Sequence, residues 1–343
     1  MPVGMHDSPH DHLANLSPGD IDPLHSETAQ RDALIASHVL MVRPSAFGLN
    51  AETQETNAFV DSEFDEPKSV GTRAKLEFDG VVARLRAAGV SVFAFDDDRG
   101  LPDSVFPNNW FSWHTTSPGR ATVILYPMLA PSRRREIRAE WIEQVAEQLG
   151  VTLEHIVRLD HEAEKGRFLE STGSMVIDRQ GRRIYACRSA RTDEGLVREV
   201  GEVLGFDVHP FDGVDASGVP VYHTNVIMAV QESFAVVCDE AVRDEGERAA
   251  LIGSLHDAGK QAIRISLDQA MRFAGNIIQL RDASGTATGT DRVIAMSRTA
   301  WEAFDDDQRA ELARHGRIVA PAIDTIEHIG GGSVRCMIAE VGN

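Results

Sequence analysis

The sequence predicts an α/β protein in which short strands and helices alternate along most of its length. Apolar or β-branched runs of about four to six residues are typical of strands, and they stand at HVLMV, VSVFAF, TVILYP, SMVID, RIYAC, NVIMAV, FAVVC, QAIRIS and RVIAMS. Stretches with helical character lie between many of them, at residues 69–88, 132–149, 194–204, 244–258 and 300–315. Repeated alternation of this kind favours a layered or closed-ring α/β domain.

Some of these strands follow one another without an intervening helix. A DRQGRR turn joins SMVID to RIYAC, and a short QES link joins NVIMAV to FAVVC. The repeating unit is therefore strand, strand, helix, and it recurs about five times. A nucleotide cofactor is not expected, because HVLMVRPSAFGLN carries neither a dinucleotide fingerprint nor a Walker A motif.

The N-terminal segment differs in composition from the rest of the chain. Residues 1–36 are rich in Asp, His, Pro and Ser without a sustained apolar period, so they are predicted to form a mobile extension. Residues 37–343 are expected to form a single domain. MPVGMHDSPHDH lacks the apolar segment of a secretory signal, and no apolar run approaches the roughly 18 residues that span a bilayer. A cytoplasmic location is therefore expected.

The chain is strongly acidic, with 34 Lys and Arg against 53 Asp and Glu and a formal net charge of −19. Phosphate contacts need a basic face and anionic membranes attract basic segments, so neither nucleic acid nor a membrane is an expected partner. The cysteines, Cys187, Cys238 and Cys336, are widely spaced and form no C-x-x-C pair. A disulfide framework and a structural zinc site are therefore not expected.

Three residues that could act together in catalysis stand beside predicted strands. Cys336 follows three glycines (330–332) in IEHIGGGSVRCMIAE, and glycines let a substrate approach the backbone closely. His223 opens the strand NVIMAV, and Glu170 opens SMVID. If these strands converge on one axis, the three side chains form a Cys–His–Glu set for nucleophilic catalysis. The alternative is that Cys336 is a small hydrophobic residue that begins a buried C-terminal strand, CMIAEV.

The segment LPDSVFPNNW contains two adjacent asparagines, Asn108 and Asn109. Beside Pro and Trp, such a pair usually forms a turn whose side chains cap local backbone. In a binding site, the two carboxamides would both donate to and accept from a neutral polar ligand. The local sequence alone favours the turn.

Five segments taken in order, LPDSVFPNNW, LESTGSMV, ACRSART, YHTN and GGGSVRCM, resemble the site motifs of the guanidino-group-modifying superfamily. These are the penteins, which include arginine deiminase, dimethylargininase and the amidinotransferases. With MVRPSAFGLN and FAGNIIQL, the chain is most similar to the citrulline utilization hydrolase branch (the CtlX type). The resemblance runs from about residue 38 to the end of the sequence. It implies a single pentein catalytic domain, a five-fold pseudo-symmetric β/α propeller around a substrate channel.

The resemblance also implies roles for individual residues. Cys336 corresponds to the family's nucleophile, His223 to its general acid/base, and Glu170 to the carboxylate that orients this histidine. Asp103 stands where relatives hold the substrate α-amino group, and Arg191 stands where they bind the α-carboxylate.

The remaining positions concern the reacting end of the substrate. Phe106 corresponds to a pocket wall. Guanidinium-processing relatives have carboxylates at the positions of Asn109 and Asn225, and some of them also at the position of Asn108. Carboxylates pair with a planar guanidinium, but facing a neutral urea they would be buried without a counter-charge. Asparagine keeps the shape, removes the charge and offers both donors and an acceptor. The asparagines therefore favour a ureido substrate.

The resulting hypothesis is a cysteine hydrolase of the ureido group of L-citrulline. It would form ornithine, carbon dioxide and ammonia through a covalent thioenzyme, and the sequence does not decide which leaving group departs first. The alternatives are a guanidino-substrate hydrolase or amidinotransferase, of the arginine deiminase or dimethylargininase type, and a non-catalytic propeller. No metal and no organic cofactor are expected. The expected partner is a small amino-acid substrate, and a homo-oligomer is compatible with the sequence.

Overall fold

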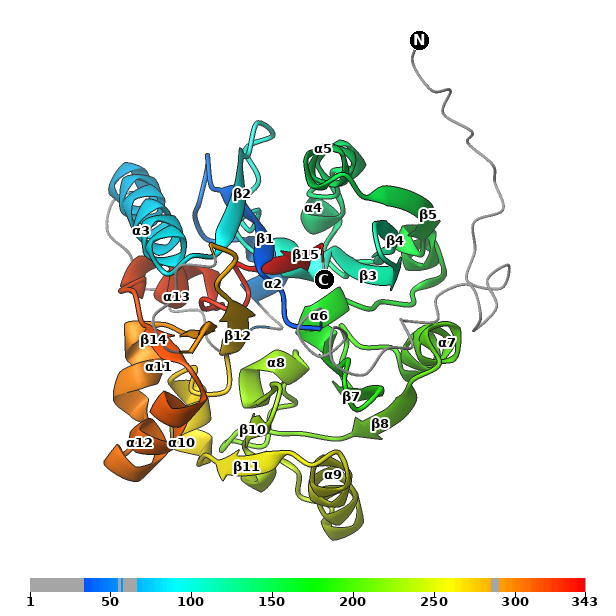
Figure 1. Ribbon diagram of the computed structural model, residues 1–343, viewed down its shortest axis with the longest axis vertical. Coiled ribbons are helices and arrows are strands. Elements are labelled where there is room, and N and C mark those ends of the chain that lie inside the picture. Colours follow the sequence, from blue (N-terminus) through cyan, green and yellow to red (C-terminus); the bar gives the residue numbers. More distant parts are fainter. Residues whose placement is uncertain (1–33, 55–56, 58–66, 285–289, 343) are drawn as a thin grey trace.

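The strands form five sheets of three strands each in the part of the chain that the structure describes, residues 34–54, 57, 67–284 and 290–342. The structure is a computed structural model (Figure 1). In each sheet the first pair of strands is antiparallel and the second pair is parallel. The sheets are β15–β1–β2 (Ala339–Val341, His38–Arg43, Ser91–Asp96), β3–β4–β5 (Phe111–Ser117, Arg120–Leu125, Thr152–Arg158), β6–β7–β8 (Met175–Asp178, Arg183–Cys187, Asp207–Phe211), β9–β10–β11 (Met228–Val230, Phe234–Val237, Gln261–Arg264) and β12–β13–β14 (Ile278–Arg281, Arg292–Ala295, Arg317–Val319).

Helices connect the two parallel strands of each sheet, as a parallel pair requires a crossover. The crossover helices are α3 (Pro67–Ala87), α4 (Pro131–Arg134) with α5 (Ala139–Leu149), α7 (Glu194–Leu204), α9 (Glu245–Asp257), and α11 (Arg298–Ala303) with α12 (Asp306–His315). The predicted strand–strand–helix unit is therefore confirmed, and Figure 1 shows the five modules arranged around a common centre.

Shorter elements lie between and at the ends of the modules. They are α2 (Ala51–Gln54), α6 (Ser171–Ser174), α8 (Thr224–Ile227), α10 (Leu267–Met271), α13 (Asp324–Gly330), and the 3-10 turns η2 (Pro107–Asn109), η3 (Asp160–Lys165) and η4 (Asp239–Ala241). Among the helices of the described residues, none is long and apolar enough to cross a bilayer.

Helix α7 shows how local sequence sets the bounds of an element. The Asp193 side chain caps its first turn by accepting a hydrogen bond from the backbone N–H of Leu196 at 2.8 Å. Gly205 ends it with φ of 65°, a left-handed conformation that favours glycine. The buried residues of α7 face the sheet of its own module. The helix predicted at 194–204 has these bounds.

Two predicted helices are each broken into two. The helix expected at 132–149 stops at Arg134 and resumes at Ala139, because the chain turns between them and buries Arg133 and Glu136. The helix expected at 300–315 is interrupted where Asp305 and Gln308 form a capping box, which starts α12 afresh. Both breaks depend on local hydrogen bonds that hydrophobic periodicity does not report.

Two predicted strands are shorter than expected. In NVIMAV, residues Thr224–Ile227 form a helical turn, and β9 begins only at Met228. The C-terminal strand begins at Ala339 rather than at Cys336, which lies in the turn before it. Several strands were not predicted, among them β5 and β8, because most of their residues are partly exposed and polar side chains interrupt their apolar runs.

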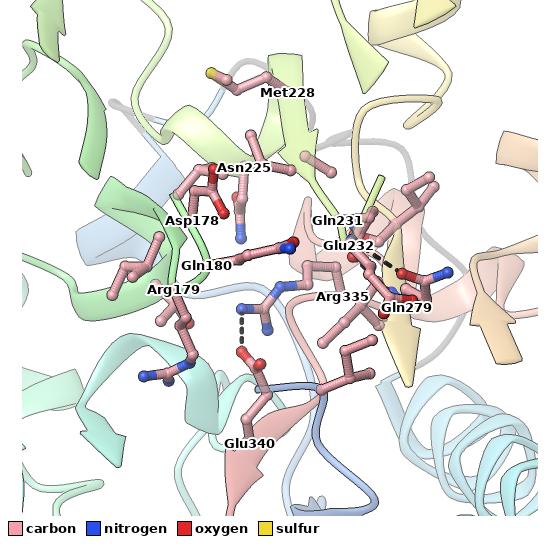
Figure 2. A pocket seen from close by; sticks show the side chains of 18 of the residues that line it. Asp178, Arg179, Gln180, Asn225, Met228, Gln231, Glu232, Gln279, Arg335 and Glu340 are labelled. Atoms are coloured by element: carbon pink, nitrogen blue, oxygen red, sulfur yellow. Dashed lines mark hydrogen bonds and ion pairs between the residues drawn. The ribbon is translucent and has the colours of Figure 1, made fainter. Parts of the chain in front are cut away.

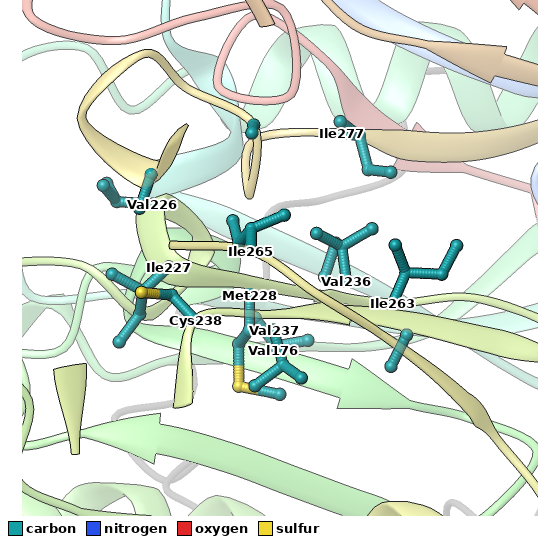
Figure 3. Close-up of a cluster of buried hydrophobic side chains, with 14 of the residues drawn as sticks. Val176, Val226, Ile227, Met228, Val236, Val237, Cys238, Ile263, Ile265 and Ile277 are labelled. Carbon is teal, nitrogen blue, oxygen red and sulfur yellow. The ribbon is translucent and has the colours of Figure 1, made fainter. Parts of the chain in front are cut away.

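The core follows the modules and consists of four clusters of buried apolar side chains. The largest contains β9, β10 and β11 and the turn before them, and Figure 3 shows Val226, Met228, Val236 and Ile263 packed in it together with Cys238. This packing holds the strands in place, and the turns at the centre of the molecule project from the ends of these strands.

The N-terminal boundary of the packed chain differs slightly from the expected one. Residues 1–33 of the predicted extension lie outside the described residues. Ile35 and Ala36 are buried, and the Ala36 carbonyl accepts a hydrogen bond from the Arg281 N–H at 2.9 Å. The packed body thus includes these residues, which were assigned to the extension.

Candidate active site

The turn before the first strand of each sheet carries polar residues. Asn109 precedes β3, Glu170 precedes β6, His223 precedes β9, Asn276 precedes β12 and Cys336 precedes β15. First strands of neighbouring sheets pack together, as β15 does with β3 and β6 with β9, and α6 contacts both η2 and α8. The five turns therefore meet at the centre of the molecule.

A cavity of about 290 Å³, here called the front cavity, lies at this meeting point. Its walls include six residues that the sequence predicted for the site, namely Asp103, Phe106, Asn109, Arg191, His223 and Cys336. Thr53, Asn57, Arg133, Tyr222 and glycines 330–332 complete them. Three other predicted residues, Glu170, Asn108 and Asn225, are not among the residues that line this cavity. Glu170 contacts His223, and both asparagines are buried.

His223 and Glu170 form a buried pair. His223 Nε2 lies 2.7 Å from Glu170 Oε2, and neither side chain is appreciably exposed. Burial lowers the pKa of His223 to about 4, outweighing the carboxylate beside it, so the imidazole is neutral. A carboxylate only accepts, so Nε2 donates to it and leaves Nδ1 as the acceptor. The pair can therefore take up a proton at Nδ1.

The Glu170 carboxylate stays ionised although it is completely buried. Burial alone would raise the pKa of Glu170, but Arg191, His223 and Arg133 together hold it well below its usual range. Arg191 Nη1 lies 3.4 Å and Arg133 Nη1 lies 4.0 Å from Oε2, while the Leu129 N–H donates to Oε1 at 3.1 Å. These contacts also fix the rotation of the carboxylate.

The Cys336 thiol receives two amide donors. The sulfur lies 3.3 Å from Asn276 Nδ2 and 3.7 Å from Asn225 Nδ2, and the residue is 4% exposed at the front cavity. Cys187 and Cys238 lie away from the front cavity, and burial raises the pKa of the Cys187 thiol to about 12 and that of Cys238 to about 11. Only Cys336 therefore has the surroundings of a nucleophile among the three cysteines.

Asp103 and Arg191 place opposite charges on the cavity wall. Asp103 Oδ2 accepts hydrogen bonds from Asn50 Nδ2 at 2.8 Å and Thr53 Oγ1 at 3.2 Å. The Arg191 guanidinium lies 4.8 Å from the centre of the Tyr222 ring, in the range of a cation–π contact. The two charges suit the two ends of a zwitterion.

Phe106 closes the cavity against the glycine segment. A Cβ atom on Gly330 would lie 2.8 Å from the Phe106 ring, and one on Gly332 would lie 2.9 Å from it. The close approach of this ring requires residues without side chains at both positions.

The three predicted asparagines have different surroundings. Asn109 Oδ1 accepts from Arg133 Nη1 at 2.8 Å, while its buried Nδ2 has no hydrogen-bond partner among the described residues. Asn108 is completely buried, and neither polar atom of its side chain has a partner there. Asn225 touches the thiol with Nδ2, and its buried Oδ1 likewise lacks a partner within the described ranges.

Asn225 lines a second cavity of about 790 Å³, here called the rear cavity. Figure 2 shows the charged and amide side chains around it, with Arg335 paired to Glu340 at 3.0 Å. Arg335 directly precedes Cys336, and its N–H donates to Asn276 Oδ1 at 3.0 Å. The wall that holds the thiol is thus shared between the two cavities.

Four residues in contact with this centre had no role in the sequence prediction: Arg133, Glu136, Tyr222 and Asn276. Arg133 is buried in a two-point ion pair with Glu136, at 3.1 and 2.9 Å, although its SRRRE context is typical of an exposed helix. Burial raises the pKa of Glu136, and the Arg133 guanidinium opposes this shift by stabilising the carboxylate. Asn276 lies in the FAGNIIQL segment, which was noted only for its resemblance.

The described residues contain no cluster of three or more His, Cys, Asp or Glu side chains able to hold a metal ion. The N-terminal histidines His6, His10 and His12, which could be read from the sequence as a metal cluster, lie outside the described residues.

Five sheets of this topology around a central site define the pentein superfamily of guanidino-group-modifying proteins, as the sequence predicted. The family model for eukaryotic N,N-dimethylarginine dimethylhydrolase matches residues 43–343, and the chain belongs to this family. No curated protein matches the chain.

Solved structures with the same fold are similar over most of the chain. The N-terminal domain of ArgZ, a cyanobacterial arginine dihydrolase, has a TM-score of 0.66 at 17% identity and covers 89% of this chain and 97% of its own. A dimethylargininase from Pseudomonas aeruginosa, complexed with citrulline, has a TM-score of 0.58 at 17% identity, with coverages of 89% and 99%. AgrE with ornithine and NAD⁺ has a TM-score of 0.65 at 18% identity, and the match covers 89% of this chain but only 39% of that one.

Replacement of single cysteines should distinguish the thiols. Cys336→Ser should abolish turnover with little change in stability, whereas Cys187→Ser and Cys238→Ser should leave turnover largely intact. Alkylation by iodoacetamide, mapped by mass spectrometry, should label Cys336 first and slow down in the presence of substrate. Preferential labelling of Cys187 or Cys238 would refute the assignment.

Gly173 tests the packing behind the imidazole. A Cβ there would lie 2.3 Å from Asn109 Nδ2 and 2.9 Å from His223 Nδ1, so Gly173→Ala should lower kcat/KM by about 100-fold through displacement of both groups. Gly80→Ala is the matched control, because Gly80 lies in α3 with no neighbour within 4 Å. Equal activity of the two variants would show that His223 and Asn109 need no fixed position.

Acid should destabilise the fold through its buried histidines. Burial holds the pKa of His223 at about 4 and that of His114 well below its ordinary value. Because the unfolded chain takes up these protons first, stability is complete above pH 6.5 and falls as the pH drops toward 4, by about 1.4 kcal/mol per pH unit for each proton. Urea unfolding at several pH values measures the slope. His223→Asn should flatten it, and the exposed control His256→Asn should leave it unchanged.

Proposed function

We propose that the protein is a cysteine hydrolase that breaks a carbon–nitrogen bond at the terminal ureido group of a free amino acid, with L-citrulline as the substrate. The observation that carries this proposal is the neutrality of the groups around the thiol. Asn225 and Asn276 touch the sulfur, and Asn109 lies on the adjoining wall of the front cavity. Amides suit a neutral ureido group, whose oxygen needs donors and whose N–H groups need acceptors.

The rest of the cavity supports an amino-acid substrate. Asp103 and Arg191 both line it, and their charges complement an α-amino and an α-carboxylate group. The glycines at positions 330–332 and the Phe106 ring close one side of the cavity. These features favour a small zwitterion over a peptide or a polymer.

The mechanism follows from the buried pair and the thiol. His223 Nδ1 takes up the thiol proton, and the Cys336 sulfur bonds to the ureido carbon while its oxygen gains negative charge. Collapse breaks one carbon–nitrogen bond, and His223 returns the proton to the leaving nitrogen. Water then cleaves the thioenzyme at the same carbon and frees the thiol. The carbamic acid that this step releases is unstable and loses carbon dioxide, which breaks the second carbon–nitrogen bond. Either order of leaving groups ends at ornithine, carbon dioxide and ammonia.

Glu170 acts through His223 rather than on the substrate. Its ionised carboxylate holds Nε2–H at 2.7 Å, which keeps Nδ1 free as the acceptor and stabilises the imidazolium that forms when the proton arrives. Glu170 is therefore a positioning residue.

A guanidino substrate, arginine or dimethylarginine, is the second candidate, and the comparisons favour it. The matching family model describes a dimethylarginine dimethylhydrolase, and ArgZ is an arginine dihydrolase. The two candidates are chemically connected. Complete hydrolysis of arginine requires two steps, and the second step acts on a ureido group.

Assays of ornithine and ammonia from citrulline, arginine and dimethylarginine test the proposal, and citrulline should have the highest kcat/KM. Asn109→Asp should lower its kcat/KM by about 30-fold, which corresponds to roughly 2 kcal/mol, because a carboxylate held by Arg133 would replace the Nδ2 donor beside the developing oxyanion. Asn109→Leu separates this charge effect from the loss of a hydrogen bond. Higher activity on arginine in the unaltered protein would favour the guanidino candidate.

A further inference from the structure

Arg133 uses nearly all its hydrogen-bonding capacity inside the protein. It is 2% exposed; Nε and Nη2 bind Glu136, and Nη2 also donates to the Phe106 carbonyl at 3.1 Å. Nη1 donates to Asn109 Oδ1 at 2.8 Å and lies 4.0 Å from Glu170 Oε2. A guanidinium has five N–H donors, and these contacts leave little for a substrate carboxylate.

The contact with Arg133 decides which way the Asn109 carboxamide points. A guanidinium only donates, so the amide oxygen must face Arg133 and the amide nitrogen must face the other way. On that other side, Nδ2 lies beside Gly173 and the His223 ring, since a Cβ on Gly173 would meet both at 2.3 and 2.9 Å. Asn109 thus offers a buried donor, still without a partner among the described residues, next to the imidazole.

We propose that Arg133 is a specificity-determining positioning residue, which selects a ureido over a guanidino group by fixing the orientation of Asn109. Asn109 Nδ2 then donates to the ureido oxygen and to the charge that this oxygen gains during attack. A guanidinium carries only donors at its terminus, so it would face Nδ2 donor to donor. This inference rests on the proposed function, because it explains a preference for citrulline.

Releasing the Asn109 carboxamide from Arg133 should remove the preference for citrulline over arginine. In Arg133→Gln, Asn109 is free to rotate and present its oxygen, so the ratio of kcat/KM for citrulline to that for arginine should fall by at least about tenfold. Arg133→Lys retains a donor and should restore part of the ratio. Because Arg133→Gln leaves Glu136 without its partner, the double variant Arg133→Gln with Glu136→Gln removes both charges together and guards against misfolding.

Two controls separate orientation from structure. Glu136→Gln leaves the contact between Arg133 and Asn109 in place, and Arg138→Gln changes another arginine, 9% exposed, that binds Asp98 and Glu140 away from the cavity. Both should keep the ratio of the unaltered protein, and circular dichroism should show native folding in every variant.

The outcomes distinguish this inference from the proposed function. An unaltered protein that prefers arginine would overturn both. A preference for citrulline that stays unchanged in folded Arg133→Gln and in the double variant would overturn the inference alone. An equal rise in KM for both substrates would overturn it too, because Arg133 would then bind the common amino-acid end. A fall in the ratio confined to the Arg133 variants supports it.

Discussion

The ionised carboxylate of Glu170 is the charge on which the centre of the molecule depends. An uncompensated carboxylate in a completely buried position would cost several kcal/mol, and here two arginines, an imidazole and a backbone N–H surround it. The same two arginines hold other parts of the site, Arg133 through Asn109 and Arg191 through the Thr53 carbonyl. The two arginines that compensate the charge of Glu170 therefore also hold the walls of the cavity in place.

Repetition of one structural unit explains how distant residues reach this network. Each sheet begins with a strand whose preceding turn points toward the centre. These turns carry two amides, a carboxylate, an imidazole and a thiol, in Asn109, Asn276, Glu170, His223 and Cys336. The modules share strand order and direction, but their turns differ in length and form. The repeated strands supply rigid bases, and the variable turns supply the chemistry.

The sequence predicts the architecture better than the details of the site. Strands such as HVLMV and RIYAC can be recognised in the sequence by their dense apolar runs, and both lie at the expected positions in the structure. The helical turns at Ser171–Ser174 and Thr224–Ile227 carry no periodic signal, because they are held by contacts between modules rather than by their own sequence. Edge strands such as β5 also lack a recognisable pattern, because polar residues at their exposed positions interrupt the apolar run.

Within the site, some residues could be predicted from the sequence and others could not. Cys336, His223 and Glu170 could be singled out because they stand next to recognisable strands, although only the structure brings them to one centre. Arg133 could not, since an arginine in a charged run reads as solvent-exposed until tertiary packing buries it. The orientation of the Asn109 carboxamide, on which the proposed preference for citrulline rests, is set by its contact with Arg133 and is not reported by composition or spacing.

The pairing of β15 with β1 has a consequence for the order in which the protein is made. β15 forms antiparallel contacts with β1, and it is the last strand in the chain order of the described residues. A ribosome therefore delivers it after every other module, and domains generally fold in the order of synthesis. The sheet of the first module is incomplete until β15 has been synthesised, and Cys336 is synthesised just before that strand. Completion of the sheet that contains β1 and β2 and the arrival of Cys336 therefore fall together in the synthesis of this chain.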